Sequence, residues 1–297
     1  MKKETPFGAV PRHLVGDNGP SVVPGYDKAN FGYATMSPVT PVEARSFHTV
    51  TLNYTVGKLG IDDTGAIRVC WRMVSDAGRP QMDSPSSKNF VTAISSGEGR
   101  LALKFEQLGG QRPWNETLTI YQRGGYLKEG DTIKIVFGDK SGGSPGMLAQ
   151  TFAEGGRDFR ITADVQATGN FVELPNTQLS IPIVAGPADS WHAILPTLRR
   201  PGEPFHLGIK AEDKWGNPTQ QANGRLTLIP SLPVKGLPTT VDYAPKDRAL
   251  TLNNLTVEKS GLLRITLEID GKKVAEAGPL IIQAGKLAGF WGDLHGQ

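Results

Sequence analysis

The chain has 297 residues, enough for two or three domains with a substantial core. Its 32 basic and 29 acidic residues give a net charge of +3, and no run of Lys or Arg indicates a nucleic-acid-binding surface. The single cysteine, Cys70, excludes an intramolecular disulfide framework, and no stretch approaches the roughly 18 apolar residues of a membrane span. Lys2 and Lys3 are not followed by the apolar segment of a signal peptide. We therefore expect a cytoplasmic protein that binds neither nucleic acid nor membranes.

The first half of the chain shows the period-two alternation of half-buried β-strands. In residues 50–56 the apolar side chains occupy one face and Thr51, Asn53 and Thr55 the other, and residues 67–73 repeat this pattern. Further strands are predicted at 31–34, 101–105, 118–120, 133–137 and 159–165. Because no helical period separates them, beyond a turn or two at 41–45, these strands predict a β-sandwich over residues 1–184.

Cys70 has two interpretations. In the predicted register it lies on the polar face of its strand, between Arg68 and Arg72, and two arginines can lower the pKa of a thiol and make it reactive. The simpler interpretation is a small residue packed under a loop or a second sheet. We favour packing because no histidine stands nearby in the sequence.

The second half of the chain predicts another sandwich, over residues 185–285. Pro182 and Pro187 disfavour a central strand at the junction, which suits a linker or an edge. Strands are predicted at 205–211, 226–228, 263–269 and 279–282, and Asp270-Gly271 is a hairpin-turn signal. The strand ending at residues 211–218, Ala-x-Asp-x-x-Gly-Asn-Pro, resembles those of immunoglobulin-like domains in bacterial surface and enzyme-accessory proteins.

Most histidines and tryptophans of the chain have structural interpretations. Four histidines show no metal-ligand spacing with one another, which favours hydrogen-bonded structural roles: His13, His48, His192 and His206. Three tryptophans are candidates for a sugar-stacking platform: Trp71, Trp191 and Trp215. Trp71, however, falls on the apolar face of its strand, so core packing is the better interpretation there.

The last residues carry the clearest candidate chemistry. Along an extended strand, residues two apart point the same way, so Asp293, His295 and Gln297 would project together. Their carboxylate, imidazole and amide oxygen are groups that a first-row metal ion can accept. The alternative is a polar tail, because three such residues do not complete a metal site.

The sequence Trp-Gly-Asp-Leu-His-Gly-Gln, residues 291–297, resembles the opening strand of the hydrolase part of an uncharacterised bacterial family. That part is related to the PHP (polymerase and histidinol phosphatase) phosphoesterases, whose first strand binds metal through two histidines. His295 matches the first of these ligands, and Gln297 stands where the wider superfamily has the second. Residues 31–39, 111–114 and 138–146 resemble the N-terminal region of the same family.

Together these observations predict an all-β chain of two consecutive immunoglobulin-like sandwiches, followed at 286–297 by the first strand of a β/α hydrolase domain. The resemblance implies the N-terminal accessory portion of a metal-dependent, phosphoesterase-like hydrolase, with the barrel and the other ligands beyond residue 297. It also implies zinc, manganese or iron in the complete protein and a C-terminal hydrolase domain as partner. No residue present is a candidate general base or nucleophile, and one strand supplies at most two or three metal ligands. We therefore expect this chain alone to be inactive, to bind divalent metal only weakly and to hold no metal cofactor. The alternative is a stand-alone module that binds a glycan or a protein.

Overall fold

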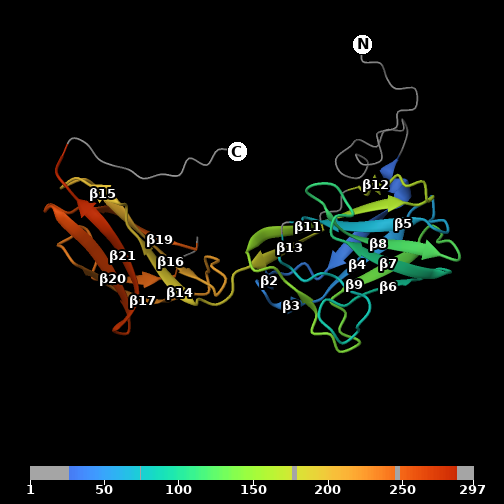
Figure 1. Cartoon of the computed structure of the whole chain (residues 1–297), viewed down its shortest axis with the longest axis horizontal. Coiled ribbons are helices and arrows are strands. Elements are labelled where there is room, and N and C mark those ends of the chain that lie inside the picture. The colour runs from blue at the N-terminus through green and yellow to red at the C-terminus, as the bar shows by residue number, and fades with distance from the viewer. Residues whose placement is uncertain (1–26, 74, 176–178, 245–247, 286–297) are drawn as a thin grey trace, which may run out of the picture. The chain divides into compact units, whose positions relative to one another are not determined.

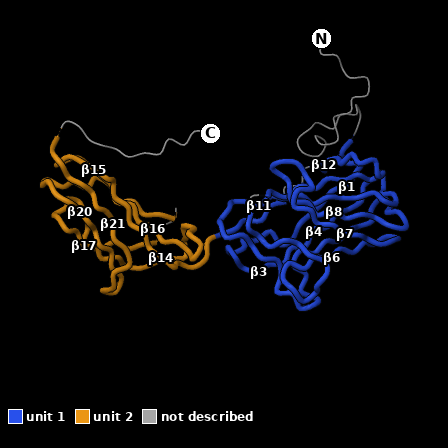
Figure 2. The backbone as a smooth tube through the Cα atoms, viewed as in Figure 1, with its two compact units in different colours: residues 1–184 blue, residues 185–297 orange. Residues whose placement is uncertain are grey.

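The computed structural model describes residues 27–73, 75–175, 179–244 and 248–285. The chain divides into two compact units, residues 1–184 and 185–297 (Figure 2). Within the described residues the only helical element is the four-residue 3-10 helix η2 (Lys28–Phe31), and strands form the rest of the regular structure. The prediction of an all-β fold is confirmed. The predicted opening strand at 286–297 lies outside the described residues.

Unit 1 is a β-sandwich (Figure 1). One sheet has the order β1-β4-β9-β6, with strands β1 (Gly32–Ser37), β4 (Val50–Val56), β9 (Thr132–Phe137) and β6 (Val91–Ser95). The other has the order β2-β13-β11-β5-β8-β7, with strands β2 (Val42–Glu43), β13 (Leu179–Val184), β11 (Glu154–Asp164), β5 (Ala66–Trp71), β8 (Glu116–Arg123) and β7 (Arg100–Glu106). The short strand β12 (Val172–Glu173) pairs with β11, and β3 (Phe47–His48) pairs with β10 (Met147–Leu148).

Alternate residues of both sheets meet in one core, as the period-two pattern predicts. Leu52 and Ile135 from the first sheet and Ile67 and Ile161 from the second are almost completely buried. Trp71, at the end of β5, lies in the same core and stacks on Phe105 at 5.8 Å between ring centroids. The core interpretation of Trp71 is therefore confirmed.

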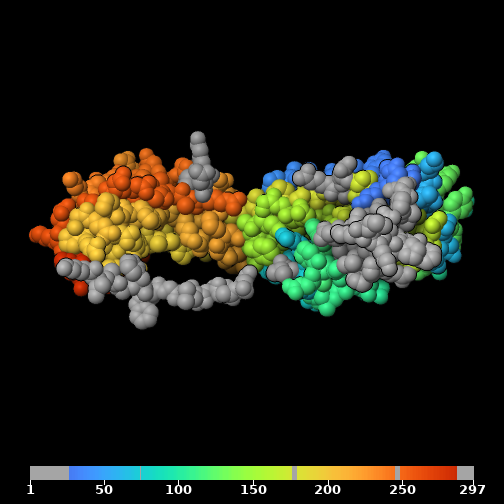
Figure 3. Space-filling model, turned by 90° about the horizontal axis from the view of Figure 1, so that it is seen from above, coloured from blue at the N-terminus to red at the C-terminus, as the bar shows by residue number. Residues whose placement is uncertain are grey.

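Unit 2 is a second sandwich, of a three-stranded and a five-stranded sheet. The first has the order β14-β16-β19, with strands β14 (Ser190–Ile194), β16 (Phe205–Glu212) and β19 (Leu250–Leu255). The second has the order β15-β21-β20-β17-β18, with strands β15 (Leu198–Arg199), β21 (Lys272–Ile282), β20 (Gly261–Ile269), β17 (Gly224–Pro230) and β18 (Thr240–Tyr243). β15 runs parallel to β21, so the start of the unit, in yellow, lies against its red end (Figure 3). Leu207, Leu226 and Leu263 fill its core.

The junction differs from the expectation. Pro182 lies within β13, which pairs with β11 on one side and with β2 on the other, so β13 is neither a linker nor an edge strand. The strand accommodates a proline because β2 pairs only with Ile183 and Val184 and the β11 ladder is interrupted opposite Pro182. This interruption shapes the cavity described below.

In the described parts of the chain, no helical segment has the length and hydropathy that a membrane crossing requires.

Candidate ligand-binding site

A cavity of about 480 Å³ opens in unit 1 beside the ends of three strands. Its walls come from segments after β5, before β8, before β11 and within β11. The lining residues are Arg72, Met73, Ser75, Arg112, Pro113, Asn115, Gln150, Phe152, Glu154, Arg157 and Asp158. The volume is in the range of pockets that hold small molecules. The cavity is therefore a candidate site for a small ligand.

A β-bulge places the central side chain of this cavity. The register of β11 on β13 shifts so that residues 155–156 together oppose Pro182. Proline has no N–H to donate to the ladder, and a bulge with two glycines lets the strand bend past it. Beyond the bulge, Arg157 falls in the same row as Phe159 and Ile161, which face the core. An arginine therefore occupies a core-facing position at the cavity.

The Arg157 side chain is buried without a close counter-charge. The residue is 8% exposed, and no carboxylate in the described residues lies within the 4 Å of an ion pair with it. One guanidinium nitrogen donates to Ser75 Oγ and Gln150 Oε1, both at a long 3.4 Å. Burial lowers the pKa of Arg157, yet a guanidinium keeps its proton in proteins. Burying a charge costs several kcal/mol unless a partner offsets it.

Charged groups of both signs surround Arg157. Arg72 and Arg112 are exposed and line the cavity together with Arg157, and the carboxylates of Glu154 and Asp158 line it as well. The negative charges of Glu116, Glu154 and Asp76 favour the charged form of Arg157. None of these carboxylates, however, forms an ion pair with the guanidinium in the described residues.

Two neutral side chains of the cavity, Gln150 and Asn115, differ in their hydrogen bonding. Gln150 is fully engaged: its Oε1 accepts from Ser75 Oγ, and its Nε2 donates to Phe152 O at 3.1 Å and to Glu154 Oε2 at 3.0 Å. Asn115 is 8% exposed, and its Oδ1 has no hydrogen-bond partner among the described residues. A buried acceptor without a donor is unfavourable by about 1–3 kcal/mol. Asn115 therefore lines the cavity with a buried acceptor that has no donor among the described residues.

Apolar side chains complete the walls. Met73, Pro113 and Phe152 line the cavity, and Phe152 is 40% exposed. The cavity therefore combines a buried cation and a free acceptor with apolar surface, the usual composition of a small-molecule site.

The positive charge of Arg157 acts to lower the pKa of two titratable groups, His48 and Glu116. Burial, and after it the positive charge of Arg157, lowers the pKa of His48 to about 4. Burial raises the pKa of Glu116, and the charges of Arg157 and Arg79 oppose this shift only in part. His48 is therefore neutral at pH 7 and adds no second positive charge beside Arg157.

The residues predicted from the sequence are not the residues of this cavity. Asp293, His295 and Gln297 lie outside the described residues, and in the described ranges no three His, Cys, Asp or Glu side chains gather to hold a metal ion. The sequence analysis missed Arg157. An arginine two residues before Phe159, in phase with the apolar face of its strand, was the signal that could have found it.

Cys70 and the tryptophans have the structural surroundings that packing predicts. Cys70 is buried and its Sγ accepts from Thr117 Oγ1 at 3.6 Å. Trp191 packs edge-to-face on Tyr243, with 4.7 Å between ring centroids, and Trp215 is exposed in unit 2. Because Trp71 is in the core of unit 1, the three tryptophans do not form a stacking platform.

A serine, a histidine and a glutamate also lie together in unit 2, but their geometry does not fit nucleophilic catalysis. His192 Nε2 is 3.3 Å from Ser190 Oγ and 2.9 Å from Glu212 Oε2, so one nitrogen faces both partners. A catalytic triad needs the carboxylate on one ring nitrogen and the nucleophile on the other. Glu212 also pairs with Lys210 at 2.5 Å. The cluster is a surface ion-pair group on β14 and β16.

No protein-family model matches the chain, and a search of curated proteins finds no match. Similar solved structures include a cohesin module from a family 33 glycoside hydrolase of Clostridium perfringens ATCC13124, at 10% identity and a TM-score of 0.32, covering 53% of this chain and 99% of the module. The type II cohesin dyad of the ScaA scaffoldin from Acetivibrio cellulolyticus aligns at 10% identity and a TM-score of 0.27, over 81% of this chain and 88% of its own.

The adhesin InvE of Yersinia pseudotuberculosis aligns at 13% identity and a TM-score of 0.23. The alignment covers 81% of this chain and 55% of InvE. At TM-scores of this size the similarity carries no argument about ligands or partners. The strands and the cavity of the chain itself define its class, a two-unit β-sandwich protein with an arginine-lined cavity.

Proposed function

We propose that this chain is a non-catalytic β-sandwich binding module whose unit 1 holds an anionic group of its ligand against Arg157. The observation that carries the proposal is a guanidinium that is 8% exposed, lines a cavity and has no carboxylate within 4 Å in the described residues. The planar fork of an arginine matches a carboxylate, sulfate or phosphate through two parallel hydrogen bonds. A bound anion would supply the counter-charge.

Acetate is the simplest probe of this site. We expect sodium acetate, exchanged for chloride at constant ionic strength, to shift the backbone amide signals of Ser75, Asn115 and Arg157 to saturation. The affinity should be in the millimolar range, because so small a ligand has few atoms through which to gain binding free energy. The shifts should disappear in Arg157→Met, because the charge that holds the anion is then gone.

Arg100→Met is the matched control, since Arg100 is an exposed arginine at the start of β7 in the same unit. It removes the same charge and should leave the acetate shifts intact. Saturable shifts of equal size in Arg157→Met would contradict the proposal, and so would their absence from the unmodified chain.

The terminal motif supports a second candidate function. Residues 291–297 resemble the opening strand of a PHP-like hydrolase domain, so the module would be the accessory portion of a metal-dependent, phosphoesterase-like hydrolase. In that arrangement His295 and Gln297 would be metal ligands for zinc, manganese or iron, and the hydrolase domain would be the partner of the module.

We expect no turnover of phosphomonoesters or phosphodiesters by this chain with added manganese, zinc or iron. A single strand supplies at most about three ligands, whereas a catalytic metal needs at least three in fixed geometry with supporting hydrogen bonds. Turnover that disappears in His295→Ala would show instead that residues 1–297 already hold a working site.

A further inference from the structure

We infer that two copies of this chain associate through strand β7 of unit 1, the two strands pairing antiparallel about a two-fold axis at Leu103. The inference concerns a surface that the Arg157 cavity does not use, so it stands or falls independently of the proposed function. Its basis is an open sheet edge whose sequence is complementary to itself.

The outer edge of β7 is open to another strand. β7 is the last strand of its sheet, and all seven of its residues pair with β8 without a bulge. Among the described residues, no strand or loop forms a backbone hydrogen bond with residues 100–106 on the other side. In an antiparallel pair the N–H and C=O groups of alternate residues point away from the neighbouring strand. A long, regular edge of this kind is a template for a further strand.

The side chains of β7 that face the core are only partly covered. Three of them pack against the core of unit 1 and remain half-buried: Leu101, Leu103 and Phe105. Leu118, on the neighbouring strand β8, is by contrast fully buried. A strand added beside β7 would extend the sheet and cover the three side chains from the open side. The edge therefore favours an occupant with apolar side chains at the same spacing.

A second copy of β7 has this spacing. When two copies pair antiparallel about Leu103, Leu103 lies opposite its own counterpart and Leu101 lies opposite Phe105 of the second copy. Residues directly opposite each other point to the same face of a sheet, so these side chains form one continuous apolar row. A register shifted by one residue would instead place the apolar side chains of each copy opposite the row that carries the charges of the other.

The charged residues of β7 select the same register. With Leu103 at the axis, Arg100 lies opposite Glu106 of the second copy at both ends of the ladder, and Lys104 lies opposite the neutral Ala102. A shift by two residues would place Arg100 opposite Lys104, or Lys104 opposite its own counterpart, and like charges directly opposite are destabilising. Among registers that pair five or more residues of each copy, only the one about Leu103 pairs unlike charges.

Arg100 has a like charge on one side and an open edge on the other. It lies opposite Arg123 of β8, and no carboxylate of the described residues lies within ion-pair distance of either guanidinium. Asp63 lines a surface hollow with both arginines but accepts from a backbone N–H at 2.9 Å. Glu106 of a second copy would supply the missing counter-charge. Glu106 pairs with Lys104 in its own chain at 2.9 Å, and its second oxygen can still accept from Arg100.

Sedimentation equilibrium of the full chain between about 1 µM and 1 mM tests the inference. We expect a reversible dimer with a dissociation constant of roughly 10–100 µM, because one paired edge buries less than the roughly 1,200–2,000 Å² of a standard interface. Arg100→Glu or Glu106→Arg should weaken the dimer at least about tenfold, since each places like charges opposite at both ends of the ladder. Lys58→Glu, a charge reversal of the same size at an exposed turn residue, should leave the dimer unchanged.

Two combinations of these variants separate strand pairing from a loss of fold. Arg100→Glu with Glu106→Arg in one chain should dimerise like the unmodified chain, because unlike charges again lie opposite each other. An equimolar mixture of the two single variants should form a mixed dimer, although neither dimerises alone, because the variants then complement each other. A monomer at all concentrations, a dimer that neither single reversal weakens, or a mixture and a double variant that stay monomeric would each overturn the inference.

Discussion

Lowering the pH from 7 to 4 is expected to destabilise unit 1 by up to about 3 kcal/mol through His48 alone. Burial and the positive charges of Arg157 and Lys140 lower its pKa from 6.5 to about 4, against a hydrogen bond with Met147 that raises it. In the unfolded chain the imidazole takes up its proton near pH 6.5, whereas in the folded unit it stays neutral to about pH 4. The stabilisation is therefore complete above pH 6.5 and is lost as the pH falls through this window, at about 1.4 kcal/mol per pH unit.

Denaturant unfolding between pH 4 and 7, followed by the amide signals of unit 1, measures this loss. His48→Gln, which has no proton to gain, should remove most of the slope. Glu116 acts in the opposite direction, since its raised pKa favours the folded unit at low pH, so the difference between the two proteins isolates His48. Asp139, whose pKa lies below its usual value, contributes only under more acidic conditions. Equal slopes in both proteins would contradict the prediction.

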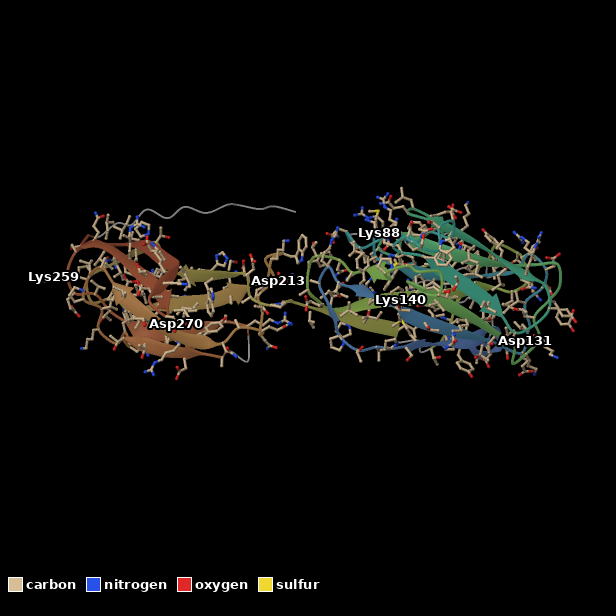
Figure 4. The ribbon with its side chains drawn as sticks, turned by 90° about the horizontal axis from the view of Figure 1, so that it is seen from below. Lys88, Asp131, Lys140, Asp213, Lys259 and Asp270 are labelled. Atoms are coloured by element: carbon tan, nitrogen blue, oxygen red, sulfur yellow. The ribbon has the colours of Figure 1, made fainter. Side chains whose placement is uncertain are left out.

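Asp213→Ala is expected to destabilise unit 2 by about 3–5 kcal/mol, because one buried carboxylate organises the loop after β16 (Figure 4). Asp213 is 4% exposed and accepts from the backbone N–H groups of Gly186 at 3.0 Å and of Trp215 and Asn217 at 2.9 Å. The Asn217 side-chain amide donates to both of its oxygens. Burial alone raises the pKa of Asp213, but these hydrogen bonds outweigh it and the pKa is lowered.

Chemical denaturation of unit 2 measures the loss. Asp213→Asn keeps an acceptor oxygen and should have a smaller effect. Asp242→Ala, at an exposed position of β18, is the control, and its free energy of unfolding should lie within about 0.5 kcal/mol of that of the unmodified chain. A change below about 1 kcal/mol in Asp213→Ala would mean that the loop is held by other contacts.

The long strands were predictable because they alternate. Residues 50–56 have apolar and polar side chains in strict succession, and the strand found there has the same bounds. The two-residue strands β2, β3, β10, β12 and β15 were missed because two residues have no period. β21 was expected only at 279–282, whereas it begins at Lys272, because Lys-Lys-Val-Ala-Glu-Ala-Gly does not alternate and gains its pairing from β20.

The cavity could not be predicted because it is assembled from segments far apart in the chain. Arg72, Arg112 and Arg157 come together only through the pairing of β5 with β8 and β11. The sequence marked Pro182 as a disturbance, but only the register shows that it stands opposite the bulge at 155–156 and thereby directs Arg157. The terminal motif, by contrast, is local in sequence, and its role stays a prediction.

Removing an arginine that supports the fold lowers the free energy of unfolding, whereas removing one that only binds a ligand does not. The substitution of Arg157 therefore shows which of the two roles it has. Replacing a buried charge by an apolar side chain of similar length is often neutral or stabilising, whereas breaking a buried ion pair costs about 3–5 kcal/mol. Gln150 Oε1, which accepts from Arg157, keeps Ser75 Oγ as a donor at 3.2 Å when the guanidinium is absent. Little of the fold therefore depends on the guanidinium.

The free energy of unfolding of unit 1 in Arg157→Met, measured in chloride without ligand, is the most direct test. We expect a value within about 1 kcal/mol of the unmodified chain, or higher, in a variant that no longer binds carboxylates. A loss of about 3 kcal/mol or more would show that the charge of Arg157 supports the fold, and would contradict its assignment to a ligand.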